Sequence, residues 1–290
     1  MDFSLVQPFD NQVLSFFQTV QQPILTLFFQ TASLLGNPVL WIVLSAILYW
    51  KGKEVQAVLI MNLIVFSALV SNAFKSVFLR PRPNAEQYIV TKEFFQDHFA
   101  NSLSYGGSFP SGHATLISSL FSYWFGKVTK CWKLLLAVSL VCVIIARMYL
   151  GWHFLSDVIA GLILGILIGK FNGWLVYEVR QHEVQIESAK SLRVLILVFL
   201  CALALIWLQV SNLAFIVLGF YAGFYWFKKL KLQHQGTLVK QFTGFAGLGV
   251  IGLGYLFFKE FSPIILFLLG LWISFGNPLL YQKWTSRKAV

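Results

Sequence analysis

The stretch Arg147-Met-Tyr-Leu-Gly-Trp-His153-Phe-Leu-Ser-Asp157 joins two charge-free apolar runs, residues 134–146 and 158–169. Runs of this kind, lengthened to about 20 residues by the residues at their ends, are typical of helices that cross a membrane. An ionisable residue in or beside such a helix costs roughly 2.5–3.5 kcal/mol on insertion scales, so by default it indicates a function. The stretch therefore predicts two membrane helices whose shared end carries chemistry.

The composition of the whole chain is that of an integral membrane protein. Of its 290 residues, 58% are apolar and 11% are charged, and the mean hydropathy is +0.73, whereas about a quarter of the residues in a soluble domain are charged. The net charge of +11 could indicate nucleic-acid binding, but the basic residues form short clusters between apolar runs, which is typical of topology signals. We therefore expect a membrane environment and no nucleic-acid partner.

The apolar runs predict an all-α, polytopic membrane helix bundle of ten helices. Residues 11–50 carry no charge and are long enough for two spans, with a turn at Gly36-Asn37-Pro38. The first of these, residues 13–34, is partly polar, so we expect it to lie tilted or partly in the interface. The other runs are 55–74, 114–126, 134–146, 158–169, 241–258, 261–282 and the double-length run 194–227, which has its expected turn at Gln209, Ser211 and Asn212.

These helices divide into two predicted domains: a six-helix core within residues 1–173, and about four additional transmembrane helices within residues 194–282. Gly161, Gly165, Gly169 and Gly173 recur every four residues and predict close helix packing. The three cysteines, Cys131, Cys142 and Cys201, are too few and too scattered for a disulfide framework or a metal site.

The loops predict the orientation. If the helices alternate, 16 of the 22 Lys and Arg residues fall on one side, which the positive-inside rule makes cytoplasmic. The ionisable clusters then open to the periplasm, the cell exterior or a lumen. The longest outer loop, residues 76–110, holds Lys92, Glu93, Asp97 and His98 and could form a lid.

His153 and Asp157 are four residues apart, so on a helix they would share a face. A carboxylate bound to one imidazole nitrogen fixes the tautomer and leaves the other nitrogen as a nucleophile. Arg147 lies before the expected break at Gly151, and its planar guanidinium suits phosphoryl oxygens.

Two further clusters predict phosphate chemistry. Pro110-Ser111-Gly112-His113 precedes an apolar run, so its free amides can bind phosphate at a helix start and His113 can act as a general acid. Lys75 and Arg82 add two cations at the end of another span. Arg80-Pro81 and Arg82-Pro83 offer two alternative registers, and Arg82 has the six-residue spacing from Lys75.

Together these clusters resemble the signature of the type 2 phosphatidic acid phosphatase superfamily, over about residues 20–172. Its three parts are matched by Lys75 with Arg82-Pro83, by residues 110–113, and by Arg147 with His153 and Asp157. Ala146 stands where the family usually has serine. The resemblance implies that His153 is the nucleophile, oriented by Asp157, that His113 is the general acid, and that no metal or cofactor is needed. The phosphate clamp that it implies consists of Lys75, Arg82, Ser111, Gly112 and Arg147.

The function expected from this resemblance is hydrolysis of a lipid phosphate or diphosphate in the bilayer, with undecaprenyl diphosphate, phosphatidylglycerol phosphate and phosphatidic acid among the candidate substrates. The expected location is a bacterial inner membrane, with the site on the non-cytoplasmic face. One alternative is a phosphotransferase that passes the phosphoryl group to a lipid or sugar hydroxyl. Another is a transporter, against which the scarcity of charges within the spans argues.

Overall fold

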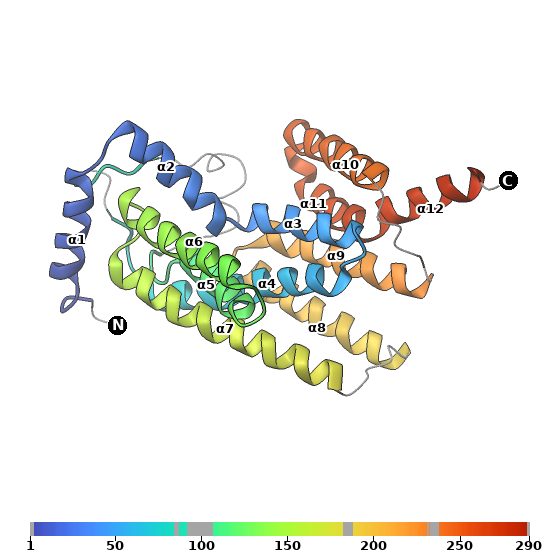
Figure 1. Cartoon of the computed structure of the whole chain (residues 1–290), viewed down its shortest axis with the longest axis horizontal. Helices are drawn as coiled ribbons and strands as arrows, with labels where there is room; N and C mark the ends of the chain where they lie inside the picture. The colour runs from blue at the N-terminus through green and yellow to red at the C-terminus, as the bar shows by residue number, and fades with distance from the viewer. Residues whose placement is uncertain are drawn as a thin grey trace. The chain divides into compact units, whose positions relative to one another are not determined.

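The computed structural model describes residues 3–83, 87–91, 107–181, 188–230, 232 and 238–288. Every regular element within these ranges is helical (Figure 1), which confirms the predicted all-α fold class. The chain divides into two compact units. Unit 1 comprises Met1–Leu40 and Phe66–His182, and unit 2 comprises Trp41–Val65 and Glu183–Val290.

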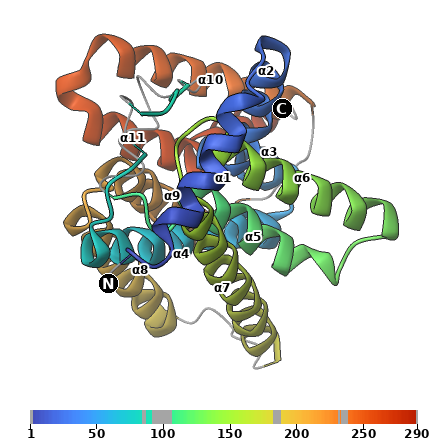
Figure 2. The same cartoon turned by 90° about the vertical axis from the view of Figure 1, so that its left-hand side faces the viewer.

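Unit 1 is built around three neighbouring helices, α5 (Gly112–Phe125), α6 (Lys130–Tyr149) and α7 (Leu155–Gln181), which lie side by side in Figure 1. It also contains α1 (Gln7–Thr19), α2 (Pro23–Ser33) and the second half of α4 (Glu54–Phe78). The N-terminal helix α1 contacts α6 and α7 near the end where α7 begins (Figure 2). All eight predicted site residues belong to this unit.

The single helix expected over residues 13–34 is wrong, because α1 ends at Thr19 and α2 begins at Pro23. Gln22 has extended backbone and Pro23 occupies the first helical position, where its missing N–H costs nothing. The expected turn at Gly36-Asn37-Pro38 is confirmed by a short 3₁₀ turn, Leu34–Gly36, followed by α3 (Pro38–Trp50). Pro23–Gly36 and Pro38–Trp50 are bent by 54° relative to each other and can together form one broken span, where two spans, the first tilted or partly in the interface, were expected.

Glycines on α7 determine how closely it approaches α5. A methyl group at Gly161 would lie 2.6 Å from the carbonyl oxygen of Ser111, and one at Gly169 would lie 2.4 Å from that of Ser119. The hydroxyl of Ser118 donates to the Gly161 carbonyl at 3.3 Å. The predicted close packing is confirmed at these positions, whereas a methyl group at Gly173 would meet only an ordinary contact at 3.9 Å.

Unit 2 combines α3 and the first half of α4 with the later helices. These are α8 (Ser188–Trp207), α9 (Ser211–Lys229), α10 (Leu238–Phe257), α11 (Ser262–Leu271) and α12 (Asn277–Lys288), the last two joined by a π-helical segment, Trp272–Gly276. Trp50 is fully buried and donates from Nε1 to the carbonyl of Ile273 at 2.8 Å. The chain reverses between α8 and α9 at Gln209, whose φ is 62°, so the turn predicted there is confirmed.

Four helices of the described part are long and apolar enough to cross a membrane, and the bent pair makes up to five spans. The protein is therefore a multi-pass membrane protein.

Candidate active site

The corner between α6 and α7 holds three of the predicted residues. Arg147 lies in the last turn of α6, and its carbonyl accepts from the backbone N–H of His153 at 3.2 Å. The break predicted at Gly151 is confirmed: its φ is +76°, and a side chain there would lie 2.6 Å from the Ile89 carbonyl oxygen. Only glycine adopts such a conformation readily.

His153 does not lie on the same helix as Asp157, contrary to the sequence prediction, because α7 begins at Leu155. Asp157 occupies the third helical position and accepts from the Phe154 N–H through Oδ2 at 2.9 Å, which is the backward contact of a capping box. The same Oδ2 lies 3.6 Å from Nδ1 of His153. That distance exceeds a hydrogen bond, but contacts of this kind are commonly long before substrate binds and shorten in the reacting complex.

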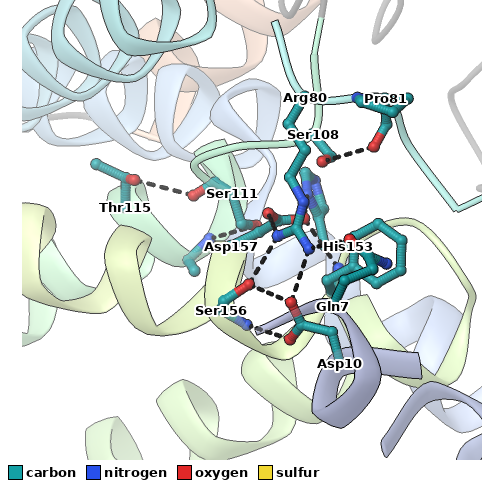
Figure 3. Close-up of polar contacts among 12 residues, drawn as sticks. Gln7, Asp10, Arg80, Pro81, Ser108, Ser111, Thr115, His153, Ser156 and Asp157 are labelled. Carbon is teal, nitrogen blue, oxygen red and sulfur yellow. Dashed lines mark hydrogen bonds and ion pairs between the residues drawn. The ribbon is translucent and has the colours of Figure 1, made fainter. Parts of the chain in front are cut away.

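The start of α5 is fixed against the same corner. Ser111 is the N-cap of α5, as predicted, and its Oγ accepts from the Ala114 N–H. Its own N–H donates to the carbonyl of Asp157 at 3.0 Å (Figure 3). This bond brings the N-terminus of α5 beside Asp157, and the amides at a helix N-terminus are suited to binding phosphate oxygens.

Lys75 lies close to the start of α5 at Gly112, and His113 of the same helix start lies close to Gly36. A methyl group on Gly112 would lie 3.9 Å from Nζ of Lys75, and one on Gly36 would lie 2.8 Å from Cβ of His113. Lys75 is buried, with 2% of its surface exposed. The end of α4, the start of α5 and the turn before α3 therefore meet at one end of unit 1.

The ring of Trp152 brings Arg82 and Arg147 together. The guanidinium carbons lie 5.5 Å from the ring centre for Arg82 and 5.9 Å for Arg147, within the range of cation–π contacts. The indole N–H donates to the Thr91 carbonyl at 2.8 Å. Arg147 also donates from Nη1 to the hydroxyl of Ser33 at 2.9 Å.

Burial lowers the pKa of His153 well below its ordinary value, and the positive charges of Arg147, Arg82 and Lys75, with that of His113, lower it further. His153 is therefore neutral at neutral pH. A neutral imidazole with its proton on Nδ1, toward Asp157, leaves the lone pair on Nε2 for an electrophile.

The structure adds residues that the motif spacing did not indicate. Arg80, weighed only as an alternative register, donates from Nη1 to Oδ1 of Asp157 at 2.6 Å and from Nη2 to Oδ2 of Asp10 at 2.7 Å. The hydroxyl of Ser33 accepts from Arg147, and the hydroxyl of Ser156 accepts from Arg80. The two Arg-Pro pairs were the sequence signal for Arg80, whereas Asp10 and Ser33 had none, because only tertiary packing brings them to the site. The suggested lid residues Lys92, Glu93, Asp97 and His98 lie outside the described residues.

Comparison with known proteins places this chain in a family. Residues 56–181 match the model of the PAP2 superfamily. A lipid A 4'-phosphatase of Bacteroides thetaiotaomicron is 31% identical over 185 residues, which make up 58% of this chain and 75% of the relative. The chain belongs to the PAP2 superfamily.

Other PAP2 proteins are similar over comparable lengths. A lipid A 4'-phosphatase of Porphyromonas gingivalis is 27% identical over 198 residues, 60% of this chain and 79% of the relative. The crystal structure of a transmembrane PAP2-type phosphatidylglycerolphosphate phosphatase from Bacillus subtilis matches with a TM-score of 0.49 and 21% identity, covering 61% of this chain and 88% of that one. The PAP2 match contains all eight predicted site residues, whereas α1 and α2 precede it.

Proposed function

We propose that this protein hydrolyses a phosphomonoester or diphosphate of a membrane lipid through a phosphohistidine intermediate at His153, on the non-cytoplasmic face. The main support is the environment of His153, which is buried, neutral and surrounded by the charges of Lys75, Arg82 and Arg147. A neutral nucleophile among several cations suits attack on a phosphate dianion, because the cations stabilise the charge that spreads over the phosphoryl oxygens.

The proposed reaction has two steps. Nε2 of His153 attacks phosphorus, the phosphorus–oxygen bond to the lipid breaks, and His113 donates a proton to the departing oxygen. Asp157 stabilises the positive charge on the ring. Water then attacks the phosphorus of the phosphohistidine and gives a proton to His113, the bond between phosphorus and Nε2 breaks, and inorganic phosphate leaves. In both steps the amides at the start of α5 bind phosphoryl oxygens.

The proposed substrate is a lipid rather than a soluble phosphate. The chain is a membrane protein whose relatives include lipid A 4'-phosphatases, and a site among membrane helices admits an amphipathic molecule from the side. Undecaprenyl diphosphate, phosphatidylglycerol phosphate and phosphatidic acid share the phosphate chemistry that the clamp recognises. Because Lys75, Arg82 and Arg147 supply the positive charge, the proposal includes hydrolysis without a metal.

The test is phosphate release by the purified protein from a panel of lipid phosphates, with vanadate and with EDTA. We expect inhibition by vanadate, which mimics the phosphoryl transition state, and no effect of EDTA. His153→Ala should abolish release and His113→Ala should slow it, with labelled phosphoenzyme accumulating from a substrate whose leaving group needs no proton. Lys130→Ala, at the opposite end of α6, serves as the control. Turnover by His153→Ala near that of the control would refute the mechanism, and transfer of label to a lipid hydroxyl would make the protein a phosphotransferase.

A further inference from the structure

The guanidinium of Arg80 points toward Asp157, Ser156 and Asp10 (Figure 3). Arg80 lies two residues after the end of α4 and has 2% of its surface exposed. Its guanidinium carbon lies 4.4 Å from the ring centre of Phe3 and 4.3 Å from that of Phe154. Two aromatic faces at these distances fix the plane of the guanidinium and stabilise its charge.

Both terminal nitrogens of Arg80 donate to acceptors within unit 1. Nη1 donates to Oδ1 of Asp157 at 2.6 Å and to the hydroxyl of Ser156 at 2.7 Å. Nη2 donates to Oδ2 of Asp10 at 2.7 Å and to Oε1 of Gln7 at 2.8 Å. Two carboxylates therefore neutralise this arginine, so it is unsuited to binding a phosphate anion. Arg80 and Arg82, two residues apart, have different surroundings.

The two oxygens of Asp157 have separate contacts. Oδ1 accepts from Arg80, while Oδ2 accepts from the Phe154 N–H and faces Nδ1 of His153. The bond to Arg80 fixes the rotation of the carboxylate and hence the direction of Oδ2. Arg80 can thus act on the nucleophile through Asp157 without touching the substrate.

Asp10 connects this contact to the N-terminal helix. It has 1% of its surface exposed, although its neighbour Phe9 on α1 has 59% exposed. Its Oδ1 accepts from the backbone N–H of Ser156 at 2.9 Å, and its Oδ2 accepts from the Ser156 hydroxyl. A carboxylate at the first turn of α7 is favoured by the helix dipole. Asp10 therefore holds the start of α7 and shares the charge of Arg80 with Asp157.

We propose that Arg80 and Asp10 are positioning residues for the reaction: Arg80 orients Asp157 toward His153, and Asp10 limits how strongly Arg80 attracts Asp157. The inference rests on the proposed function, because it assumes that Asp157 orients the nucleophile. Without Arg80, the Asp157 carboxylate can turn away from His153. Without the charge of Asp10, Arg80 pairs with Asp157 alone, which weakens the interaction of Asp157 with His153. Both changes should lower kcat and leave phosphate binding largely intact.

The test compares Arg80→Gln with Arg82→Gln in purified full-length protein, measuring kcat, the inhibition constant of vanadate and the rate of phosphoenzyme formation. We expect Arg80→Gln to lower kcat and phosphoenzyme formation by roughly 100-fold, the loss that follows a misplacement of about 1 Å at a reacting group. Its vanadate inhibition constant should stay within about threefold of the original, whereas Arg82→Gln should raise this constant by roughly tenfold or more. A merely structural role for Arg80 would not separate the two quantities.

The link to Asp10 is tested by a double-mutant cycle. Asp10→Asn, which keeps the shape of the side chain, should lower kcat by roughly tenfold. If Asp10 acts through Arg80, the double variant should be about as active as Arg80→Gln alone, because the effects of residues in one network do not add. The single ammonium of Arg80→Lys cannot contact both carboxylates as a guanidinium does. The kcat of this variant should therefore lie between those of the original protein and of Arg80→Gln.

Three outcomes would overturn the inference. Folded Arg80→Gln with the original kcat would show that Asp157 needs no such support. A large rise in its vanadate inhibition constant would make Arg80 a phosphate ligand. Independent losses in the double variant would separate Asp10 from Arg80. If Arg80→Gln does not fold, the kcat and the vanadate inhibition constant of Arg80→Lys and Asp10→Asn test the positioning role in its place. An active His153→Ala, by contrast, would refute the proposed function whatever the Arg80 variants do.

Discussion

Replacing Gly165 with alanine should separate α5 from α7 and disable the site at their ends. A methyl group at Gly165 would lie 2.0 Å from the hydroxyl oxygen of Ser118, 2.3 Å from the carbonyl oxygen of Thr115 and 2.9 Å from the amide nitrogen of Ser119. The Ser118 side chain can rotate, but the other two atoms belong to the backbone of α5. Ordinary contact begins at 3.4 Å, so the helices must move apart by roughly 1 Å.

This separation would act directly on the proposed catalytic groups. The start of α5 carries Ser111 and His113, α7 carries Asp157, and the Ser111 N–H donates to the Asp157 carbonyl at 3.0 Å. A displacement of about 1 Å at reacting groups typically costs about 100-fold in rate. Overpacking of this kind also costs roughly 1–3 kcal/mol of stability, so the variant should unfold at a lower temperature.

The assay is kcat/KM of purified Gly165→Ala on a short-chain phosphate ester, with thermal unfolding monitored in the same detergent. Gly173→Ala is the matched control, since its methyl group would lie 3.9 Å from the nearest atom of Tyr123. We expect the control to keep its rate and Gly165→Ala to lose about 100-fold. Equal kcat/KM for the two variants would show that the contact between α5 and α7 does not set the catalytic geometry.

Three further predictions follow from the site and its orientation. In a background without Cys131, Cys142 and Cys201, Gln87→Cys should react with a membrane-impermeant thiol reagent on intact cells and Lys130→Cys only after lysis; the reverse pattern would invert the topology. Because the pKa of His153 is lowered, its ¹⁵N resonances should not titrate above about pH 6.5, the ordinary pKa of histidine. Its contribution to stability should fall as the pH drops below that value, since only the unfolded chain then takes up the proton. Titration of the folded protein at the ordinary pKa would contradict the burial of His153 among cations. Ser33→Asp should raise the vanadate inhibition constant by roughly tenfold or more by neutralising Arg147, whereas Ser33→Ala should change it less; similar values for the two would separate Ser33 from the clamp.

The motif clusters were predictable from the sequence because each depends on local spacing. Ser111 caps α5 and Arg147 ends α6, and both positions follow from where apolar runs begin and end. The break before Pro23 also had a signal, since proline is favoured at the first helical position. The prediction that His153 lies on the same helix as Asp157 was wrong, because Asp157 itself caps α7 at Phe154. The periodicity of apolar residues does not reveal such a contact.

The contacts of Arg80 and Asp10 could not be predicted in the same way. They are 70 residues apart in the chain, and no spacing rule connects an acidic residue of α1 with an arginine after α4. The backbone gives the arginines of the two Arg-Pro pairs different surroundings: α4 ends at Phe78, and Leu79 turns the chain with a φ of 46°. From that turn Arg80 reaches Asp157, while Arg82 lies beside Trp152.

The contacts of Arg80 and Arg147 indicate different roles for two arginines that are both buried. Arg80 donates to two carboxylates, which neutralise its positive charge, in agreement with the positioning role proposed for it. Arg147 donates to the hydroxyl of Ser33, which fixes its direction without adding a negative charge. A contact with a carboxylate neutralises the charge of an arginine, whereas a contact with a hydroxyl does not. Ser33, from α2, therefore provides a hydroxyl to the arginine beside Ala146, the position where the family usually has serine. Under the proposed function, this contact connects the N-terminal helices to phosphate binding.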